Sequence, residues 1–200
     1  MEALKRMVDV VIATCGLVAT SPVIGALAVA IWAEDGRPVF FKQERIGRSG
    51  HPFQIIKLRT MTDGAQALRR GIAPDDVRIT RVGRFLRATS LDELPQLVNV
   101  LRGEMTLVGP RPTLRYQVEQ YSARQRRRLE VLPGLTGWAQ TNGRNQLSWP
   151  ERIELDIWYV DNRSWRLDLR ILASTVVKVL RREGTYAAGG GVPIFEAKDR

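Results

Sequence analysis

The longest apolar stretch of the chain, residues 10–33, contains no charged side chain. As one helix it would be roughly 36 Å long at ~1.5 Å per residue, which is enough to cross a bilayer. The stretch is longer than the apolar part of a signal peptide, and the acidic residues after it are not typical of a cleavage site. A buried core helix is the soluble alternative, but the length favours association with a membrane.

Two arrangements of this segment in a membrane fit the pattern. Ser21 and Pro22 lie near its middle, where proline removes a helix hydrogen bond and a serine hydroxyl can satisfy a freed backbone group. The chain therefore either crosses the membrane as one kinked helix or turns back at this point. Basic residues favour the cytoplasmic side, and they flank the segment at Lys5 and Arg6 and, in larger number, after it. The body of the protein is therefore predicted to be cytoplasmic.

The remaining pattern predicts an α+β fold that is mostly helical. Two β-rich runs, residues 38–47 and 51–61, are separated by a short glycine-containing turn and predict a hairpin. Residues 63–80 are polar and predict a loop around a short helix, and the glycine-rich tail is expected to be mobile. Helical patterns follow at residues 94–102, 113–131, 150–160 and 167–182.

The last helical pattern, residues 167–182, is compatible with two placements. It carries apolar residues on more than one face and basic residues at its end, and aromatic residues lie just before it at Trp158, Tyr159 and Trp165. An amphipathic helix of this kind can lie in the membrane interface. An ordinary helix that faces the protein core fits the same residues equally well.

Composition narrows the chemistry that this chain can perform. The 200 residues include 31 basic and 21 acidic side chains, a formal net charge of +10 that indicates an anionic partner. There is one cysteine, Cys15, and one histidine, His51, so an internal disulfide is excluded and a zinc site or a histidine-dependent triad is not expected. Carboxylates and arginines must therefore carry any catalysis.

Asp92 and Glu93 are adjacent carboxylates just before an apolar run. One interpretation is structural, because Ser90 and Glu93 match a capping box in which the two residues satisfy each other's backbone donors. Alternatively, Pro95 occupies the first helical position and leaves both carboxylates on the turn that leads into the helix. In either case they lie at a positive helix end, beside groups that could bind an anion.

Arginines are concentrated in the short segments around this pair. Guanidinium groups bind phosphate oxygens in a bidentate manner, and glycine- and proline-rich loops would present them rigidly. The arginines concerned are Arg84, Arg87, Arg102, Arg111 and Arg144.

A carboxylate that attacks a phosphate must overcome the repulsion of like charges. An aspartate with a pKa near ~3.9 is ionised at neutral pH and is available as a nucleophile. At ~4 Å and an effective dielectric constant of ~20, each pair of unit charges costs about 4 kcal/mol. Arginines and Mg²⁺ can offset this repulsion, and Glu93, next to Asp92, is the predicted magnesium ligand.

The order of these motifs resembles the bacterial sugar transferases, the monotopic phosphoglycosyl transferases that start glycan assembly on polyprenol phosphate. The motifs are the Ser-Pro apolar segment, "KLRTM", "SLDELPQL", "GEMTLVGPRP", "PGLTGWAQTNGRN" and "LDIWYV". The resemblance extends from about Lys5 to Gly184. It implies a re-entrant helix–break–helix with its break at Ser21 and Pro22, followed by a small hairpin and amphipathic interfacial helices around a compact catalytic domain.

The resemblance also implies a reaction in two steps. The residue matching Asp92 attacks the sugar-bearing phosphate of a UDP-sugar and releases UMP, and undecaprenyl phosphate then captures the aspartyl phosphosugar. This is the first membrane step of bacterial glycan assembly. Glu93 is implied to help bind Mg²⁺. Contacts with phosphate or nucleotide are implied for Arg87, Pro110, Arg111, Pro112 and Arg144.

These expectations divide the chain into a membrane helix at residues 1–36, a catalytic domain at 37–184 and a tail at 185–200. The expected location is the bacterial inner membrane, with the catalytic domain on the cytoplasmic face. There it would meet UDP-sugar, undecaprenyl phosphate and membrane lipid, and a homodimer is left open. The residues do not identify the sugar.

Two other classes of function fit part of the pattern. A nucleic-acid-binding protein would explain the net charge and the basic segment at residues 122–132. It would have no use for the apolar segment, so nucleic acid is not an expected partner. A membrane-anchored scaffold without catalysis is the second alternative, and release of UMP from UDP-sugars would separate the enzyme from both.

Overall fold

The computed structural model describes residues 2–62, 76–143 and 147–181, and most of these residues are helical. The helices are α1 (Glu2–Asp35), α2 (Arg81–Thr89), α3 (Leu97–Arg102), α4 (Arg115–Val118), α5 (Ala123–Arg126), α6 (Trp138–Thr141), α7 (Trp149–Asn162) and α8 (Trp165–Arg181). The strands are β1 (Phe40–Ile46), β2 (Pro52–Leu58), β3 (Thr106–Val108) and β4 (Gly134–Thr136), and the 3-10 turns are η1 (Arg48–Gly50), η3 (Leu91–Gln96) and η4 (Arg127–Leu129). The predicted mostly helical fold with a small hairpin is confirmed.

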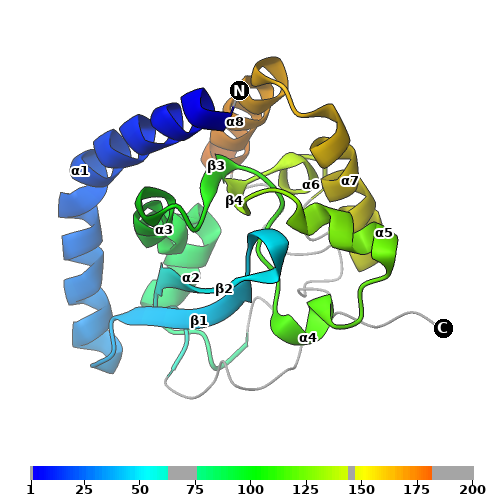
Figure 1. The fold of residues 1–200 in the computed structure, drawn as a ribbon. Helices are drawn as coiled ribbons and strands as arrows, with labels where there is room; N and C mark the ends of the chain where they lie inside the picture. The colour runs from blue at the N-terminus through cyan, green and yellow to red at the C-terminus, as the bar shows by residue number, and fades with distance from the viewer. Residues whose placement is uncertain (1, 63–75, 144–146, 182–200) are drawn as a thin grey trace.

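Helix α1 continues through the predicted break at Ser21 and Pro22 without interruption. Figure 1 shows it as two arms that meet at a bend, one across the top of the view and one down the side. Pro22 cannot donate to the carbonyl of Val18, and the hydroxyl of Ser21 donates to that carbonyl at 2.8 Å instead. The helix is therefore bent rather than broken, and its re-entrant placement in a membrane stays a prediction.

Most of α1 is exposed, although its composition is apolar. It is long and apolar enough to cross a membrane, by length and composition, and within it only Asp9, Ala13 and Ile31 are buried. An exposed apolar surface of this extent favours contact with lipid or with another protein. The large apolar side chains exposed along it are Leu4, Met7, Val11, Ile12, Val18, Val23, Val29 and Trp32.

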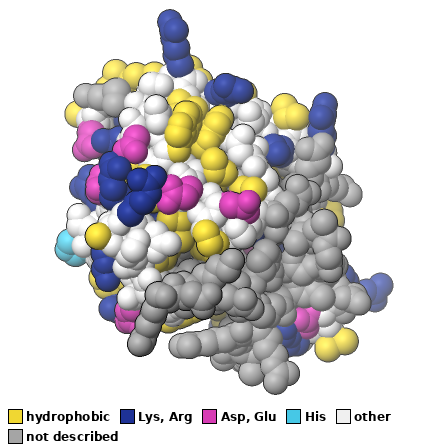
Figure 2. Space-filling model, turned by 90° about the vertical axis from the view of Figure 1, so that its right-hand side faces the viewer, with side chains coloured by type: hydrophobic (Ala, Val, Ile, Leu, Met, Phe, Trp, Pro, Cys, Tyr) yellow, Lys and Arg dark blue, Asp and Glu magenta, His cyan; other side chains and the backbone are white. Residues whose placement is uncertain are grey.

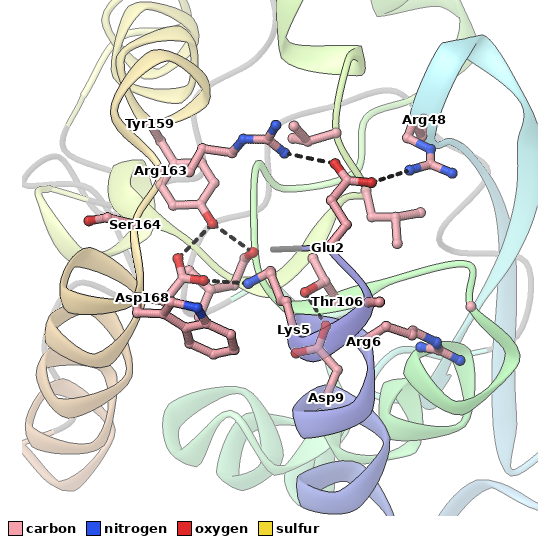
Figure 3. Close-up of a pocket in the computed structure, with 16 residues that line it drawn as sticks. Glu2, Lys5, Arg6, Asp9, Arg48, Thr106, Tyr159, Arg163, Ser164 and Asp168 are labelled. Atoms are coloured by element: carbon pink, nitrogen blue, oxygen red, sulfur yellow. Dashed lines mark hydrogen bonds and ion pairs between the residues drawn. The ribbon is translucent and has the colours of Figure 1, made fainter.

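The N-terminal end of α1 is tied to the folded body by polar contacts. Nζ of Lys5 lies 2.5 Å from Oδ2 of Asp168 in α8, and Oγ1 of Thr106 in β3 donates to Asp9 at 2.5 Å. Arg6 donates to backbone carbonyls at the end of α3. Figure 3 shows these side chains around a cavity of about 390 Å³ between α1, β3 and the start of α8.

The C-terminal end of α1 is also fixed to the body. Nη2 of Arg59 donates to the carbonyl of Asp35 at 2.7 Å, and the carboxylate of Glu34 accepts from the backbone N–H groups of Arg81 and Val82 at 2.7 and 2.9 Å. A straight helix of 34 residues would be about 51 Å long. The bend in α1 thus allows both of its ends to contact one folded unit.

Strands β1 and β2 form the predicted antiparallel hairpin. Phe41 pairs with Lys57 and Arg45 pairs with Phe53. Because side chains alternate between the two faces of a sheet, these four side chains share one face of the hairpin. Lys57 on this face forms an ion pair with Glu93 of η3, so this face is the surface on which the site described below is built.

The helical pattern at residues 113–131 was predicted as one helix and forms three short pieces, α4, α5 and η4. The prediction was wrong because local side-chain caps restart the helix. Oε1 of Gln117 accepts from the N–H of Leu114 at 2.9 Å, and Oε1 of Gln125 accepts from the N–H of Ser122 at 2.9 Å. The patterns at 150–160 and 167–182 correspond to α7 and α8 within a few residues.

Two helices, α2 and α6, and the parallel pair of strands β3 and β4 were not predicted. At residues 94–102, the α-helix begins only at Leu97, because η3 precedes it. The predicted loop at 63–80 and the tail at 185–200 lie mostly or wholly outside the described residues.

A buried cluster joins α1 to the rest of the fold. Ala13 belongs to the same buried cluster as Leu97 and Val100 of α3, Tyr159 of α7 and Ile171 of α8. Ala13 and Ile171 are fully buried, so α1 shares the core of the domain at this point.

The strands β3 and β4 meet through glycine backbones. A Cβ on Gly134 would lie 2.1 Å from the backbone nitrogen of Gly109, and a Cβ on Gly137 would lie 2.2 Å from the carbonyl oxygen of Gly109. No side chain fits between these segments, so the loop after β3 is held directly against β4.

We expect Gly134→Ala to lower the free energy of unfolding by about 3 kcal/mol, because the three atoms nearest to the new Cβ are backbone atoms that cannot rotate away. Thermal unfolding of the detergent-solubilised protein measures the loss. Gly25→Ala is the matched control, since a Cβ there would meet nothing within 4 Å. Equal melting temperatures for the two variants would contradict the packing argument.

Acidic residues of α7 offset the basic segment at residues 122–132. Nη2 of Arg124 lies 2.7 Å from Oε2 of Glu154, and Nη2 of Arg127 lies 2.5 Å from Oδ1 of Asp161. Figure 2 views the side on which α5 and α7 lie in Figure 1 and shows basic and acidic side chains next to one another. This arrangement argues against a continuous basic surface for nucleic acid here.

Candidate active site

The turn η3 carries Asp92 and Glu93 between α2 and α3. Ser90 ends α2 in the left-handed conformation, with a φ of 58°, and makes no side-chain cap to the next helix. The predicted capping box is therefore wrong, because Ser90 serves as a C-cap and the side chain of Glu93 bonds elsewhere. The alternative is closer to the structure, since both carboxylates lie on the turn that leads into α3, although Pro95 lies within that turn.

The two carboxylates have different surroundings. Oε1 of Glu93 lies 2.6 Å from Nζ of Lys57 and 2.6 Å from Nη2 of Arg111. Oδ2 of Asp92 lies 3.9 Å from Nζ of Lys57, and Asp92 accepts no hydrogen bond from any described residue. Glu93 thus holds two cations in place, whereas Asp92 has a long ion pair with Lys57 and no hydrogen bond from the described residues.

Burial and neighbouring charges give Asp92 and Glu93 different pKa values. The Asp92 side chain is 14% exposed, and burial raises its pKa to about 6, an effect that Lys57 opposes and Glu93 reinforces. Burial also disfavours the charged form of Glu93, but Arg111 and Lys57 outweigh it and hold the pKa of Glu93 well below its usual range. At neutral pH Glu93 is ionised and Asp92 is mostly ionised, with a basicity suited to a nucleophile.

Arg87 and Arg111 reach this pair from two different elements. Arg87 lies in the last turn of α2, and its charge opposes the rise that burial causes in the pKa of Asp92. Its Nη1 is buried and has no hydrogen-bond partner in the described chain. Arg111 follows β3, and Glu93 raises its pKa, so it stays protonated.

Two hydrogen bonds to its backbone carbonyls fix the loop that carries Arg111. Nη2 of Arg128 donates to the carbonyl of Arg111 at 3.0 Å, and the N–H of Gly134 donates to the carbonyl of Pro110 at 2.9 Å. Pro110 and Pro112 are buried, whereas the Arg111 side chain is 48% exposed. The loop therefore presents one guanidinium toward both Glu93 and solvent from a rigid base.

The structure brings together four of the predicted site residues, Asp92, Glu93, Arg87 and Arg111, with Pro110 and Pro112 flanking Arg111. Ser21 and Pro22 lie in the bend of α1 and are not part of this cluster. Arg144 lies outside the described residues.

Lys57 was missed by the sequence prediction, which counted it only among the basic residues after the apolar segment. Among the described residues it forms ion pairs with both carboxylates. The available signal was its place in "KLRTM", at the end of a predicted strand, but nothing local to that strand indicates what the lysine faces.

The carboxylates have the oxygen ligands that Mg²⁺ prefers, but they do not form a complete metal site. No group of three or more potential ligand side chains occurs in the described ranges. Mg²⁺ is usually held by one or two carboxylates together with substrate phosphates and water. Oε2 of Glu93 has only a 3.4 Å contact with Arg111, so the pair fits a metal that arrives with a phosphorylated substrate.

Comparison with known proteins places this chain in a family. The chain matches the family model described as bacterial sugar transferase over residues 1–182. It is 51% identical over 181 residues to a protein named uncharacterized sugar transferase EpsL of Bacillus subtilis (strain 168), covering 90% of this chain and 89% of EpsL.

Two further relatives carry names that describe a reaction. The chain is 45% identical over 196 residues to the UDP-glucose:undecaprenyl-phosphate glucose-1-phosphate transferase of Caulobacter vibrioides, covering 91% of this chain and 72% of that protein. It is 40% identical over 202 residues to the undecaprenyl-phosphate galactose phosphotransferase of Salmonella typhimurium, covering 92% of this chain and 42% of that protein. The match to the family model across nearly the whole chain shows that this protein belongs to the bacterial sugar transferase family.

Proposed function

We propose that this protein transfers a phosphosugar from a UDP-sugar to undecaprenyl phosphate through an aspartyl-phosphosugar intermediate, releasing UMP, as the first membrane step of glycan assembly. The observation that carries the proposal is the arrangement of Asp92. It is a nearly buried carboxylate without a hydrogen bond from the described residues, surrounded by Lys57, Arg87 and Arg111. The names of the Caulobacter and Salmonella relatives support the same substrates.

The chemistry follows from the difference between the two carboxylates. An oxygen of Asp92 attacks the sugar-bearing phosphorus, the bond from that phosphorus to the UMP oxygen breaks, and UMP leaves with the electron pair. A phosphate oxygen of undecaprenyl phosphate then attacks the same phosphorus and releases Asp92. Glu93 remains ionised and keeps Lys57 and Arg111 directed at the developing charge.

We propose that Glu93, with Asp92 beside it, contributes to a Mg²⁺ site completed by the donor phosphates. The ion would neutralise charge on the diphosphate. Lys57 and Arg111 would orient Glu93 in that role, since both bond to its carboxylate.

Experimentally, the full-length protein in detergent is given UDP-sugars and undecaprenyl phosphate, and UMP release is measured. The two named relatives act on glucose and galactose derivatives, so a panel of UDP-sugars is required. With a UDP-sugar alone, we expect about one UMP per active site and a mass increase on Asp92. Absence of UMP release with every UDP-sugar would favour a non-catalytic membrane scaffold.

We propose that α1 is re-entrant, enters the inner membrane from the cytoplasmic face and leaves by the same face. Lys5 pairs with Asp168, and Arg59 donates to Asp35, so both ends of α1 contact the folded body. A helix that crossed the bilayer would place these ends on opposite sides.

A cysteine at residue 3 tests this arrangement. In a Cys15→Ser background, Ala3→Cys should resist a membrane-impermeant thiol reagent in intact cells and react after permeabilisation. The reason is that residue 3 lies beside the Lys5–Asp168 contact and thus on the side of the body. Labelling in intact cells would indicate a helix that spans the membrane.

A further inference from the structure

The guanidinium groups of Arg45, Arg111 and Arg152 form a cluster beside the carboxylate pair. The N–H of Ile46 donates to the carbonyl of Thr113 at 2.9 Å, which places the end of β1, and with it Arg45, against the loop that carries Arg111. Arg128 bonds both to the backbone carbonyl of that loop and to Asp156 of α7. The third guanidinium, Arg152, lies one helical turn before Asp156 on α7.

Arg45 and Arg152 are only partly satisfied. Nη2 of Arg45 donates to Oε1 of Gln43 at 2.7 Å, while its Nε is buried without a partner in the described ranges. Nε of Arg152 donates to the carbonyl of Leu147 at 3.0 Å, and its Nη2 is likewise buried and unpartnered. Buried N–H groups of a cation cost free energy unless an acceptor satisfies them.

The charges around these groups add to that cost. Burial and repulsion by Arg111 lower the pKa of Arg45 to about 10, and Glu93 offsets this only in part. Burial and repulsion by Arg111 also lower the pKa of Arg152. The cluster thus has the character of an anion site, and the 48% exposure of the Arg111 side chain opens it to solvent.

The hairpin shows where this cluster lies relative to Asp92. Lys57 lies opposite Phe41, near the point where α1 ends. Arg45 lies on the same face four residues beyond Phe41, roughly 14 Å away at ~3.4 Å per residue. The Arg45 side chain reaches back toward Gln43, between the two positions. Lys57 and Arg45 therefore mark the two ends of one positively charged track.

We propose that Arg45 and Arg152 bind the phosphate that leaves with the nucleoside, so that the donor diphosphate extends from Asp92 toward the η1 end of the hairpin. This inference rests on the proposed function. The lipid acceptor would approach Asp92 from the α1 side, which leaves the opposite end of the track for the soluble nucleotide.

Arg45→Gln and Arg152→Gln test this assignment in the full-length protein in detergent. Each variant should bind UMP about 10- to 100-fold more weakly, the loss expected for one charged hydrogen bond, and should raise the KM for UDP-sugar. The KM for undecaprenyl phosphate should not change. Arg115→Gln is the matched control, since Arg115 is an exposed arginine whose guanidinium pairs with Glu44 on the same strand as Arg45.

Thermal unfolding supplies a second readout. Without ligand, Arg45→Gln should melt no lower than the unmodified protein, because it removes a repelled and incompletely bonded cation, and its stabilisation by UMP should be reduced. Unchanged UMP affinity in both variants, or a raised KM for undecaprenyl phosphate with normal UMP affinity, would overturn the assignment. If the unmodified protein neither binds nor releases UMP, the proposed function fails instead.

Discussion

Replacing Asp92 by asparagine is expected to reduce UMP release by at least about 10⁴-fold and to abolish the covalent intermediate. Asparagine keeps the size and position of the side chain but lacks the anionic oxygen that would attack phosphorus in the proposed mechanism. Lys57 and Arg111 both bond to Glu93 independently of Asp92, so the substrate site should persist.

A measurement of thermal stability distinguishes a variant that has lost only its catalytic chemistry from one that no longer folds. Because burial raises the pKa of Asp92 to about 6, its ionised form is destabilising in the folded protein at neutral pH, and Asp92→Asn should melt no lower than the unmodified protein. Asp161→Asn is a matched control on the surface, where Asp161 pairs with Arg127, and it should retain activity. Full turnover by Asp92→Asn would exclude the covalent mechanism.

The parts of the fold that the sequence predicted are those with a strong local period. The hairpin and the helices α7 and α8 follow from alternation and helical spacing over many residues. The parallel strands β3 and β4 have three residues each, and their pairing depends on the close approach of Gly109 and Gly134. Such a contact between distant glycines leaves no periodic signal in either segment.

The residues of the candidate site also fall into those that the sequence predicted and those that it did not. Asp92, Glu93, Arg87 and Arg111 were predicted because they occur in short loops with an unusual density of charge. Lys57 was not, because its role depends on the packing of β2 against η3, in which Lys57 contacts Glu93, 36 residues farther along the chain. The capping-box prediction failed for a related reason, since α2 ends at Ser90 and fixes its backbone in the left-handed region.

Replacing Lys57 by methionine is expected to lower kcat by about 10²- to 10³-fold, the range found when one preorganised donor is removed from a site of developing charge. The pH dependence should also change in a defined direction. In the unmodified protein the rate should fall about tenfold per pH unit below the Asp92 pKa of about 6, as the nucleophile is protonated. Lys57 opposes the rise that burial causes in this pKa. Its removal should therefore move the acid limb of the pH–rate profile, the range in which the rate falls as the pH is lowered, to higher pH.

The control for this experiment is Lys42→Met, on the opposite face of the same hairpin, where Lys42 is exposed and pairs in register with Ile56. A general weakening of the hairpin would reduce activity without shifting the pH profile, whereas loss of a charge beside Asp92 must shift it. Measurement of kcat and of kcat/KM from pH 5 to pH 9 distinguishes these cases. A Lys57→Met variant of reduced activity whose pH–rate profile falls at the same pH as that of the unmodified protein would show that the lysine does not act on the nucleophile. Glu93 and Arg111 would then have to hold the phosphate without it.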